Sequence, residues 1–236
     1  MRFDLMKPIC LIPARGGSKG IPRKNIKPLN KKPLIAHTIQ ACKNSKIFSD
    51  VIVSTDDKEI AEISQKYGAK IPFLRPKKLS LDSSSMDGVV LHAIRKLIDQ
   101  RYEFNILVLR DCTVPFIRNN DIKKSIRILK ETNADVVCGV YRQHLNPYYN
   151  IVELDSKGNL KIVKQDKKQI HTRQKAPIVY QLNGLITINV ERFLKYKRIY
   201  MPHSVPCEIK PETGLMIDTE FEFQIADCMA RNLINF

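Results

Sequence analysis

The sequence predicts an α/β fold with a mostly parallel sheet and helices on both of its faces. Short apolar runs alternate along the chain with segments in which apolar residues recur every three or four positions, the pattern of strands followed by helices. The first apolar run is continuous, which is typical of a strand buried on both faces of a parallel sheet. A glycine-rich, basic segment follows it, and ligands of such folds bind beyond the carboxyl ends of the strands.

The first predicted strand, Ile9–Ile12, leads into the segment that is most informative about function. Gly16, Gly17 and Gly20 let its backbone approach a ligand closely. Its cations are Arg15, Lys19, Arg23 and Lys24. Exposed N–H groups together with several cations suit a polyanion such as a nucleoside triphosphate. The glycine spacing matches neither G-x-G-x-x-G nor G-x-x-x-x-G-K-[ST], which argues against a dinucleotide fingerprint and a Walker-type loop.

Strand and helix patterns then alternate as far as residue 140. Pro33 is acceptable at a helix start, and Gly68 suits a left-handed cap at a helix end. We predict helices over Pro33–Lys43, Asp57–Tyr67, Met86–Asp99, Asp121–Glu131 and Glu220–Leu233, and strands over Asp50–Ser54, Lys70–Leu74, Asn105–Leu109, Ala134–Val140 and Leu185–Val190. This order gives a Rossmann-like sheet within a single domain, 1–236.

The alternation stops after Tyr141. Residues Asn150–Gln165 have the pattern of a β-hairpin with its turn at Ser156–Asn159. A two-stranded unit outside the main sheet is only marginally stable alone and needs a surface to pack on.

The net charge of +16 raises the question of nucleic-acid binding. The lysines are spread over nearly every segment, and the densest stretch, Lys157–Lys175, has Tyr180 as its lone aromatic neighbour. We therefore favour a positive field that attracts an anionic substrate over a nucleic-acid site. The six cysteines are dispersed without a C-x-x-C pair, and no apolar stretch approaches a membrane span. We expect no zinc site, no membrane insertion and a cytoplasmic location.

Residues Ala14–Asn25, ARGGSKGIPRKN, resemble the nucleotide-binding signature of the acylneuraminate cytidylyltransferases, which make CMP-sialic acids and related CMP-sugars. The family pattern, roughly A-R-x-x-S-K-G-x-P-x-K-N, is matched from Arg15 to Asn25. The resemblance implies a nucleotide-diphospho-sugar transferase-like fold, CTP as co-substrate and Mg²⁺ or Mn²⁺ as cofactor. It also implies a homodimer in which an inserted arm, Tyr141–Leu182, reaches across to the partner.

Under this resemblance the first half of the chain holds the nucleotide. The expected nucleotide-binding residues are Arg15, Gly16, Gly17, Ser18, Lys19, Lys24, Asn25, Arg75, Ser84 and Ser85, of which Arg15, Lys19 and Lys24 are also expected to be catalytic. Pro76 holds Arg75 in extended geometry, which suits a side chain aimed at a base or a phosphate. One of the serines is expected to cap the following helix. Thr55 and Asp56 either contact the nucleotide or cap the helix after them.

The second half resembles the family's sugar-binding segment. His171–Asn183, HTRQKAPIVYQLN, is similar to the pattern R-Q-x-x-P-x-x-Y/F-x-x-N-G. A substrate carboxylate asks for a bidentate cation, for which Arg173 is the best candidate. The expected sugar-binding residues are Asp111, Arg173, Gln174, Gln181 and Asn183. Two alternatives stay open: Arg173 belongs only to a basic arm, or Asn183-Gly184 is only a turn before the next strand.

The expected metal ligands are Asp218 and Asp111. Met216–Glu220 matches the family motif D-I-D-T-E with Met216 in place of the first aspartate, so Asp218 remains as the catalytic carboxylate. Alternatively Asp218 only enriches the start of the last helix, where Thr219 and Glu222 form a capping box. Asp111 stands where the sialic acid enzymes carry glutamine, and it either helps to hold the metal or binds the sugar.

The predicted reaction is transfer of CMP from CTP to the anomeric hydroxyl of a nonulosonic, sialic-type acid, with release of pyrophosphate. The departures at Asp111, Gln181 and Met216 put N-acetylneuraminate itself in doubt and leave legionaminic, pseudaminic and other ulosonic acids open. Two alternatives remain. One is a Kdo-type or other sugar nucleotidyltransferase, and the other is a non-catalytic nucleotide- or nucleic-acid-binding protein on the same scaffold.

Overall fold

A six-stranded sheet with the order β10-β6-β9-β5-β1-β4 forms the centre of the molecule. The computed structural model describes residues 6–18, 20–164, 170 and 172–232. The strands are β1 (Ile9–Pro13), β4 (Val51–Ser54), β5 (Ile106–Arg110), β6 (Val136–Gln143), β9 (Val179–Asn189) and β10 (Ser204–Glu208). β9 runs antiparallel to β5 and β6, whereas the other neighbouring pairs are parallel. The predicted mostly parallel sheet is confirmed.

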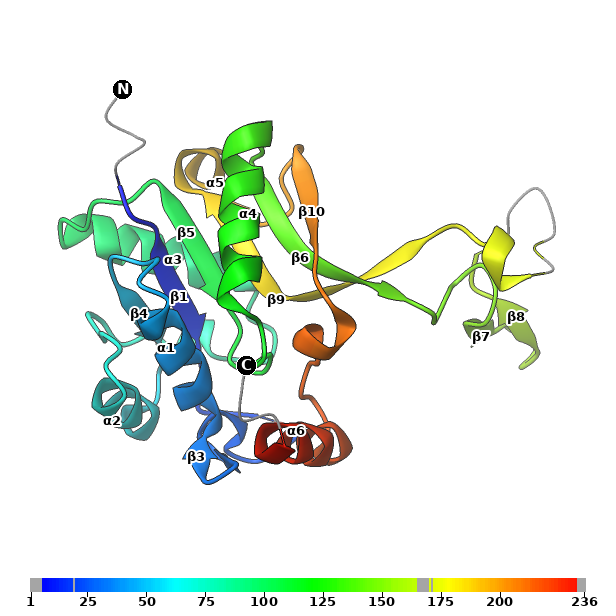
Figure 1. The fold of residues 1–236 in the computed structure, drawn as a ribbon, viewed down its shortest axis with the longest axis horizontal. Helices are drawn as coiled ribbons and strands as arrows, with labels where there is room; N and C mark the ends of the chain where they lie inside the picture. The colour runs from blue at the N-terminus through cyan, green and yellow to red at the C-terminus, as the bar shows by residue number, and fades with distance from the viewer. Residues whose placement is uncertain (1–5, 19, 165–169, 171, 233–236) are drawn as a thin grey trace.

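Helices cover both faces of this sheet (Figure 1). They are α1 (Leu34–Asn44), α2 (Lys58–Lys66) and α4 (Asn119–Thr132) on one face, and α3 (Met86–Asp99) and α5 (Val190–Tyr196) on the other. Cys10 and Ile12 of β1 pack in the core beneath the first group, while Ile9 and Leu11 pack beneath the second. Burial on both faces explains why this strand is a continuous apolar run.

A separate apolar cluster joins the C-terminal helix α6 (Glu220–Asn232) to the hairpin β2 (Pro28–Leu29) and β3 (Lys32–Pro33). Asn30, in the left-handed turn of that hairpin, donates from its Nδ2 to the Ala230 carbonyl at 2.9 Å. The predicted capping box of α6 is confirmed, because the Glu222 N–H donates to Thr219 Oγ1 at 3.2 Å and the Thr219 N–H donates to Glu222 Oε2 at 2.8 Å. Leu233, the predicted last residue of α6, lies outside the described residues.

Between β6 and β9 the chain leaves the body of the molecule. Figure 1 shows the ends of these two strands projecting as a ribbon, with β7 (Val152–Leu154) and β8 (Leu160–Ile162) near its tip. The predicted hairpin is confirmed by the antiparallel pairing of β7 with β8. Its turn is closed by the Gly158 N–H, which donates to the Asp155 carbonyl at 3.0 Å, and Gly158 has the left-handed φ of 82°. Gln165 lies outside the described residues.

Some features of the fold differ from the sequence prediction, and one open alternative is excluded. The strand predicted over Lys70–Leu74 is reduced to a single bridge between Lys70 and Ile52, since Pro72 has no N–H to donate. Asn183-Gly184 lies inside β9 and is not a turn. Strand β10 was missed because its Pro206 weakens a strand signal, although an edge strand tolerates proline. The short helix α5 was missed as well.

None of the helices in the described part of the chain is both long and apolar enough to cross a membrane.

Candidate active site

A cavity of about 200 Å³ lies where β1 and β5 end. This is the edge of the sheet at which α/β folds bind ligands. The cavity gathers predicted site residues from segments that are far apart in the sequence. Its lining consists of Pro13, Arg15, Gly17, Ser18, Lys24, Asn25, Arg75, Met86, Asp111, Thr113, Met216 and Asp218.

The segment that precedes α6 contacts residues 14–25, which we call the phosphate loop. Lys24 Nζ donates to the Ile217 carbonyl at 2.7 Å and to Asp218 Oδ1 at 2.9 Å. A Cβ atom on Gly20 would come within 2.3 Å of the Asp218 carbonyl oxygen, so this position requires glycine. An ammonium group has three N–H donors, which leaves Lys24 one donor for a ligand oxygen.

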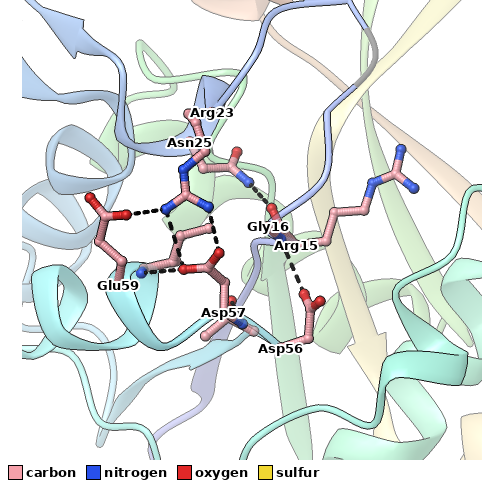
Figure 2. A network of polar contacts seen from close by, with 9 residues as sticks. Arg15, Gly16, Arg23, Asn25, Asp56, Asp57 and Glu59 are labelled. Carbon is pink, nitrogen blue, oxygen red and sulfur yellow. Dashed lines mark hydrogen bonds and ion pairs between the residues drawn. The ribbon is translucent and has the colours of Figure 1, made fainter.

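Other contacts fix the shape of the phosphate loop (Figure 2). The Gly16 N–H donates to Asp56 Oδ1 at 3.1 Å, and Asn25 Nδ2 donates to the Arg15 carbonyl at 2.9 Å. The Cys112 thiol donates to Asn25 Oδ1 at 3.0 Å, and burial raises the pKa of Cys112 far above its ordinary value, which keeps this donor protonated. Both ends of the Asn25 amide are therefore engaged within the protein, so its expected contact with the nucleotide stays a prediction.

The two expected nucleotide-binding arginines differ in exposure. Arg15 forms an ion pair with Asp82 at 2.7 Å, and both side chains are more than a third open to solvent. Arg75 is buried, with 5% of its surface exposed, and its Nη2 donates to the Ser54 carbonyl at 2.7 Å. Burial lowers the pKa of Arg75, and its Nε has no hydrogen-bond partner within the described part of the chain. That leaves a buried donor beside the cavity.

The expected serines form local hydrogen bonds. Ser85 caps α3 by accepting from the Gly88 N–H at 3.2 Å, which confirms the predicted serine cap. Ser84 Oγ donates to the Lys78 carbonyl at 2.9 Å. Among the described residues, the lining of the cavity includes neither serine, and their contact with a nucleotide stays a prediction.

The cap predicted at Thr55 or Asp56 is formed by the next residue. Asp57 accepts the Ile60 N–H at 3.0 Å and thereby caps α2. Thr55 Oγ1 accepts from the Asp57 N–H at 3.1 Å, and Asp56 holds the phosphate loop instead. The prediction was therefore wrong by one position. Threonine and aspartate both suit a helix cap, and the sequence does not show at which of these three residues the helix begins.

Both candidate metal-binding carboxylates line the cavity. Asp111 follows β5, and its Oδ1 accepts from the Thr113 N–H at 3.0 Å. Met216 is partly buried and packs against the core, so an apolar side chain stands where the family motif has a carboxylate. The described residues contain no cluster of three or more metal-binding side chains. Two carboxylates nonetheless fit Mg²⁺, which one or two carboxylates usually hold together with substrate phosphates and water.

Asn183 lies on β9 with its side chain against Gly139 of β6, and it is not among the described residues that line the cavity. It is 5% exposed, and its Oδ1 accepts from the Leu185 N–H at 2.9 Å. Its Nδ2 is buried and finds no partner in the part of the chain that is described. Gly184 next to it packs against Asp111, where a Cβ atom would come within 2.4 Å of the Asp111 Cβ.

The other expected sugar-binding residues lie on the arm. Arg173 and Gln174 belong to a short 3₁₀ helix, η4 (Arg173–Lys175), and line a second cavity of about 570 Å³ together with Arg142 and His144. Gln181 lies in the ribbon, where its Oε1 accepts from Gln143 Nε2 at 2.6 Å. Because the arm projects from the body (Figure 1), a single chain does not bring Arg173 and Gln174 to the first cavity.

A family model described as "Cytidylyltransferase" matches residues 9–223 of this chain, which includes the phosphate loop, both carboxylates and the arm. The chain belongs to the cytidylyltransferase family.

Relatives of this cytidylyltransferase agree with that assignment. The CMP-N,N'-diacetyllegionaminic acid synthase of Campylobacter jejuni is 34% identical over 222 residues, 93% of each protein. A pseudaminic acid cytidylyltransferase of the same species is 49% identical over 119 residues, which cover 50% of this chain and 51% of that one. A solved CMP:2-keto-3-deoxy-manno-octonic acid synthetase complexed with CTP has a TM-score of 0.70 at 17% identity, covering 96% of this chain and 100% of that one, and so supports the fold alone.

Four further residues of this cytidylyltransferase belong to the phosphate loop, to the cavity lining or to the end of β5. Lys19, expected to bind and act on the triphosphate, lies outside the described residues. Met86 and Thr113 also line the cavity, and sequence reasoning missed both because an apolar helix start and a loop threonine usually have structural roles. Arg110, at the end of β5, is fully buried, and its Nη2 donates to the Val114 carbonyl at 3.4 Å.

Proposed function

We propose that this cytidylyltransferase transfers CMP from CTP to the anomeric hydroxyl of a nonulosonic acid, releasing pyrophosphate. The observation that carries the proposal is the single cavity in which the cationic phosphate loop meets the carboxylates of Asp111 and Asp218. A loop of this kind neutralises a triphosphate, and paired carboxylates suit the cation that accompanies it. The relatives named for legionaminic and pseudaminic acids support this class of acceptor.

Different residues of the cavity bind different parts of CTP. Arg15, Ser18 and Lys24 bind the triphosphate, with Lys19 as a further cation, and Arg75 binds the cytidine end. Positioning of the α-phosphate and neutralisation of its charge supply most of the acceleration. Lys24 is suited to neutralise the negative charge that develops on the departing pyrophosphate. Its contacts with Ile217 and Asp218 hold its ammonium group beside the cavity.

Asp111 and Asp218 would hold Mg²⁺ or Mn²⁺. When bound, the cation neutralises phosphate oxygens and helps to orient the acceptor hydroxyl. Met216 reduces the number of protein carboxylates, so more of the coordination falls to the triphosphate and to water.

The acceptor half of the site is completed by a second copy of the chain. The first cavity is smaller than the 300–1,000 Å³ or so of most small-molecule sites. Arg173 and Gln174 lie instead on the projecting arm. In the described part of the chain, large apolar side chains of that arm are exposed to solvent: Val152, Leu154, Leu160, Ile178, Tyr180 and Leu182. A homodimer that covers this surface brings the arm of one protomer to the cavity of its partner.

The test is turnover of purified protein with CTP and a panel of acceptors that includes legionaminic, pseudaminic, N-acetylneuraminic and Kdo-type acids. We expect release of pyrophosphate with CTP and at least one nonulosonic acid, and much slower release with UTP, GTP or ATP. Turnover with the Kdo-type acid alone would replace the acceptor class. Absence of pyrophosphate with every pair would establish the non-catalytic alternative. The enzyme is proposed to act in the cytoplasm, where CTP is available.

A further inference from the structure

Arg23 has an unusual backbone conformation within the nucleotide-binding motif. It precedes the 3₁₀ helix η2 (Lys24–Ile26) with φ 56° and ψ 28°, the left-handed region. Side chains other than glycine, asparagine and aspartate rarely adopt this region, because the Cβ atom crowds the backbone. A conformation that is unfavourable by itself persists where the surrounding contacts hold it.

Two carboxylates hold the Arg23 side chain. Its Nη1 donates to Asp57 Oδ2 at 2.5 Å, and its Nη2 contacts Glu59 (Figure 2). Asp57 also caps α2, and the hydrogen bond from Arg23 lowers the pKa of Asp57. Figure 2 shows Arg15 directed away from this cluster. The Arg23 charge is thus engaged by α2.

The cavity lies elsewhere. Arg23 is not among the described residues that line it, so the sequence-based expectation that Arg23 supplies charge to the triphosphate finds no support in the structure. The residues that follow it do reach the cavity, namely Lys24 and Asn25. The direction of both side chains depends on the backbone turn that Arg23 makes, since they are consecutive in η2.

The loop that precedes α2 therefore holds the phosphate loop at two points. One is the hydrogen bond from Gly16 to Asp56, and the other is the ion pair between Arg23 and Asp57. The approach is close, because a Cβ atom on Gly16 would come within 2.7 Å of Asp57 Oδ2. Both ties involve neighbouring residues of one loop, so they act on the phosphate loop together.

We infer that Arg23 is a positioning residue for CTP, which acts through its ion pairs with Asp57 and Glu59 to direct Lys24 and Asn25 into the cavity. This inference rests on the proposed function for its kinetic test, but it adds a residue that touches no substrate.

The test compares variants that separate the ion pairs from the backbone. Arg23→Asn keeps a residue that tolerates the left-handed region and removes the ion pairs, whereas Arg23→Lys keeps a charge. We expect Arg23→Asn to raise the KM for CTP about tenfold, the effect of losing one charge-assisted contact, with the KM of the sugar acid unchanged. Arg23→Lys should recover most of that loss. Arg127→Asn, which removes the exposed ion pair with Glu131 on α4, is the matched control and should leave both constants unchanged.

A double-mutant cycle with Asp57→Asn identifies the partner. Asparagine keeps the helix cap and removes the charge. The two single variants should therefore resemble each other, and the double variant should be little worse than either one. Additive effects would show that Arg23 does not act through Asp57 and would overturn the inference.

The remaining outcomes are also decisive. An unchanged KM for CTP in Arg23→Asn, or an equal rise for both substrates, would overturn the inference and leave the proposed function standing. If the wild type releases no pyrophosphate, the proposed function fails, and calorimetric binding of CTP to the wild type and to Arg23→Asn decides the inference instead. Absence of CTP binding to the wild type would overturn both.

Discussion

The cations that the structure describes in the phosphate loop already have acidic partners. Arg15 pairs with Asp82, Arg23 with Asp57, and Lys24 with Asp218. The exposed pair at Arg15 is worth little, because solvent screens it and two mobile side chains are immobilised. A triphosphate can therefore replace Asp82 at small cost, whereas the buried surroundings of Lys24 keep that side chain in place.

Loss of either cavity cation should impair catalysis, with different effects on stability. We expect Arg15→Ala and Lys24→Ala each to cut turnover at least ~100-fold, the scale for losing one preorganised charge. Lys24→Ala should also lower the free energy of unfolding by about 1–3 kcal/mol, because the Ile217 carbonyl loses its donor. Kinetics and chemical denaturation check both statements. Lys27→Ala, which loses a pair with Glu220 and a contact with the Phe223 ring outside the cavity lining, is the control for the kinetics. Near-normal kinetics in both cavity variants would remove the triphosphate assignment.

Each of the two carboxylates should affect the Mg²⁺ concentration that turnover requires. Asp111→Asn and Asp218→Asn should each raise the Mg²⁺ concentration needed for half-maximal turnover, and Met216→Asp should be tolerated or lower it. The asparagine variants keep an oxygen that can accept, as Asp111 does from the Thr113 N–H. If Asp111→Asn leaves the Mg²⁺ dependence unchanged but raises the KM of the sugar acid, Asp111 binds the sugar and does not compensate for Met216.

The Arg23–Asp57 pair should make stability depend on pH in the acid range. The pKa of Asp57 is lowered in the folded state, so its contribution is complete above the unfolded value of about 3.9 and is lost as the pH falls through the lower folded value. The wild type should therefore exceed Arg23→Asn in unfolding free energy at pH 6, and the difference should shrink below pH 4. Urea denaturation at a series of pH values measures it. A constant difference down to pH 2 would contradict the assignment.

Among the elements, the arm and the start of α2 show where sequence patterns are informative and where they are not. The hairpin β7–β8 could be predicted because alternation and turn residues are local signals. The arm's separation from the cavity could not, since Arg15 and Arg173 belong to two separate motifs, and neither motif shows that one chain holds them in different cavities. The partners of Arg23 were equally hidden, because Asp57 and Glu59 approach it only through the packing of α2 beside the phosphate loop.

The apolar face of the arm should govern association. Leu154 is 68% exposed on β7, so Leu154→Asp should leave the chain folded. We expect it to yield monomers that bind CTP but lose turnover of the sugar acid, and the partly buried Ile151→Asp to do the same. Sedimentation, CTP calorimetry and kinetics test this. Glu153→Gln, on the opposite side of β7, is the matched control. A wild type that sediments as a monomer with full activity would contradict the dimer.

For the molecule as a whole, the net charge of +16 bears on the rate at which an anionic substrate binds rather than on the fold. We expect kcat/KM for CTP to fall as salt rises from about 20 to 300 mM, because the Debye length shrinks below ~10 Å over this range. The kcat at saturating CTP should change little. Sucrose at matched osmolality is the control for non-ionic effects. A flat response to salt would show that the positive field does not attract the nucleotide.

Most of the site's location could be predicted from sequence, since the phosphate loop follows the first strand and Asp111 follows β5 at the same edge of the sheet. The direction of β9 was beyond sequence analysis. In a sheet that helices cover on both faces, the burial of a strand does not show whether it runs parallel or antiparallel to its neighbours, and here the path of the chain through the arm sets the direction of β9.

The place of β9 between β5 and β6 also governs how the protein emerges from the ribosome. When β6 has been synthesised, the strand that must join it to β5 has not, because the whole arm is made first. The nascent chain then carries unpaired strand edges on β5 and β6, and β9 cannot join them until residue 189 has left the exit tunnel. Open edges of this kind attract other strands, so the period of translating the arm is when the chain most needs protection by chaperones.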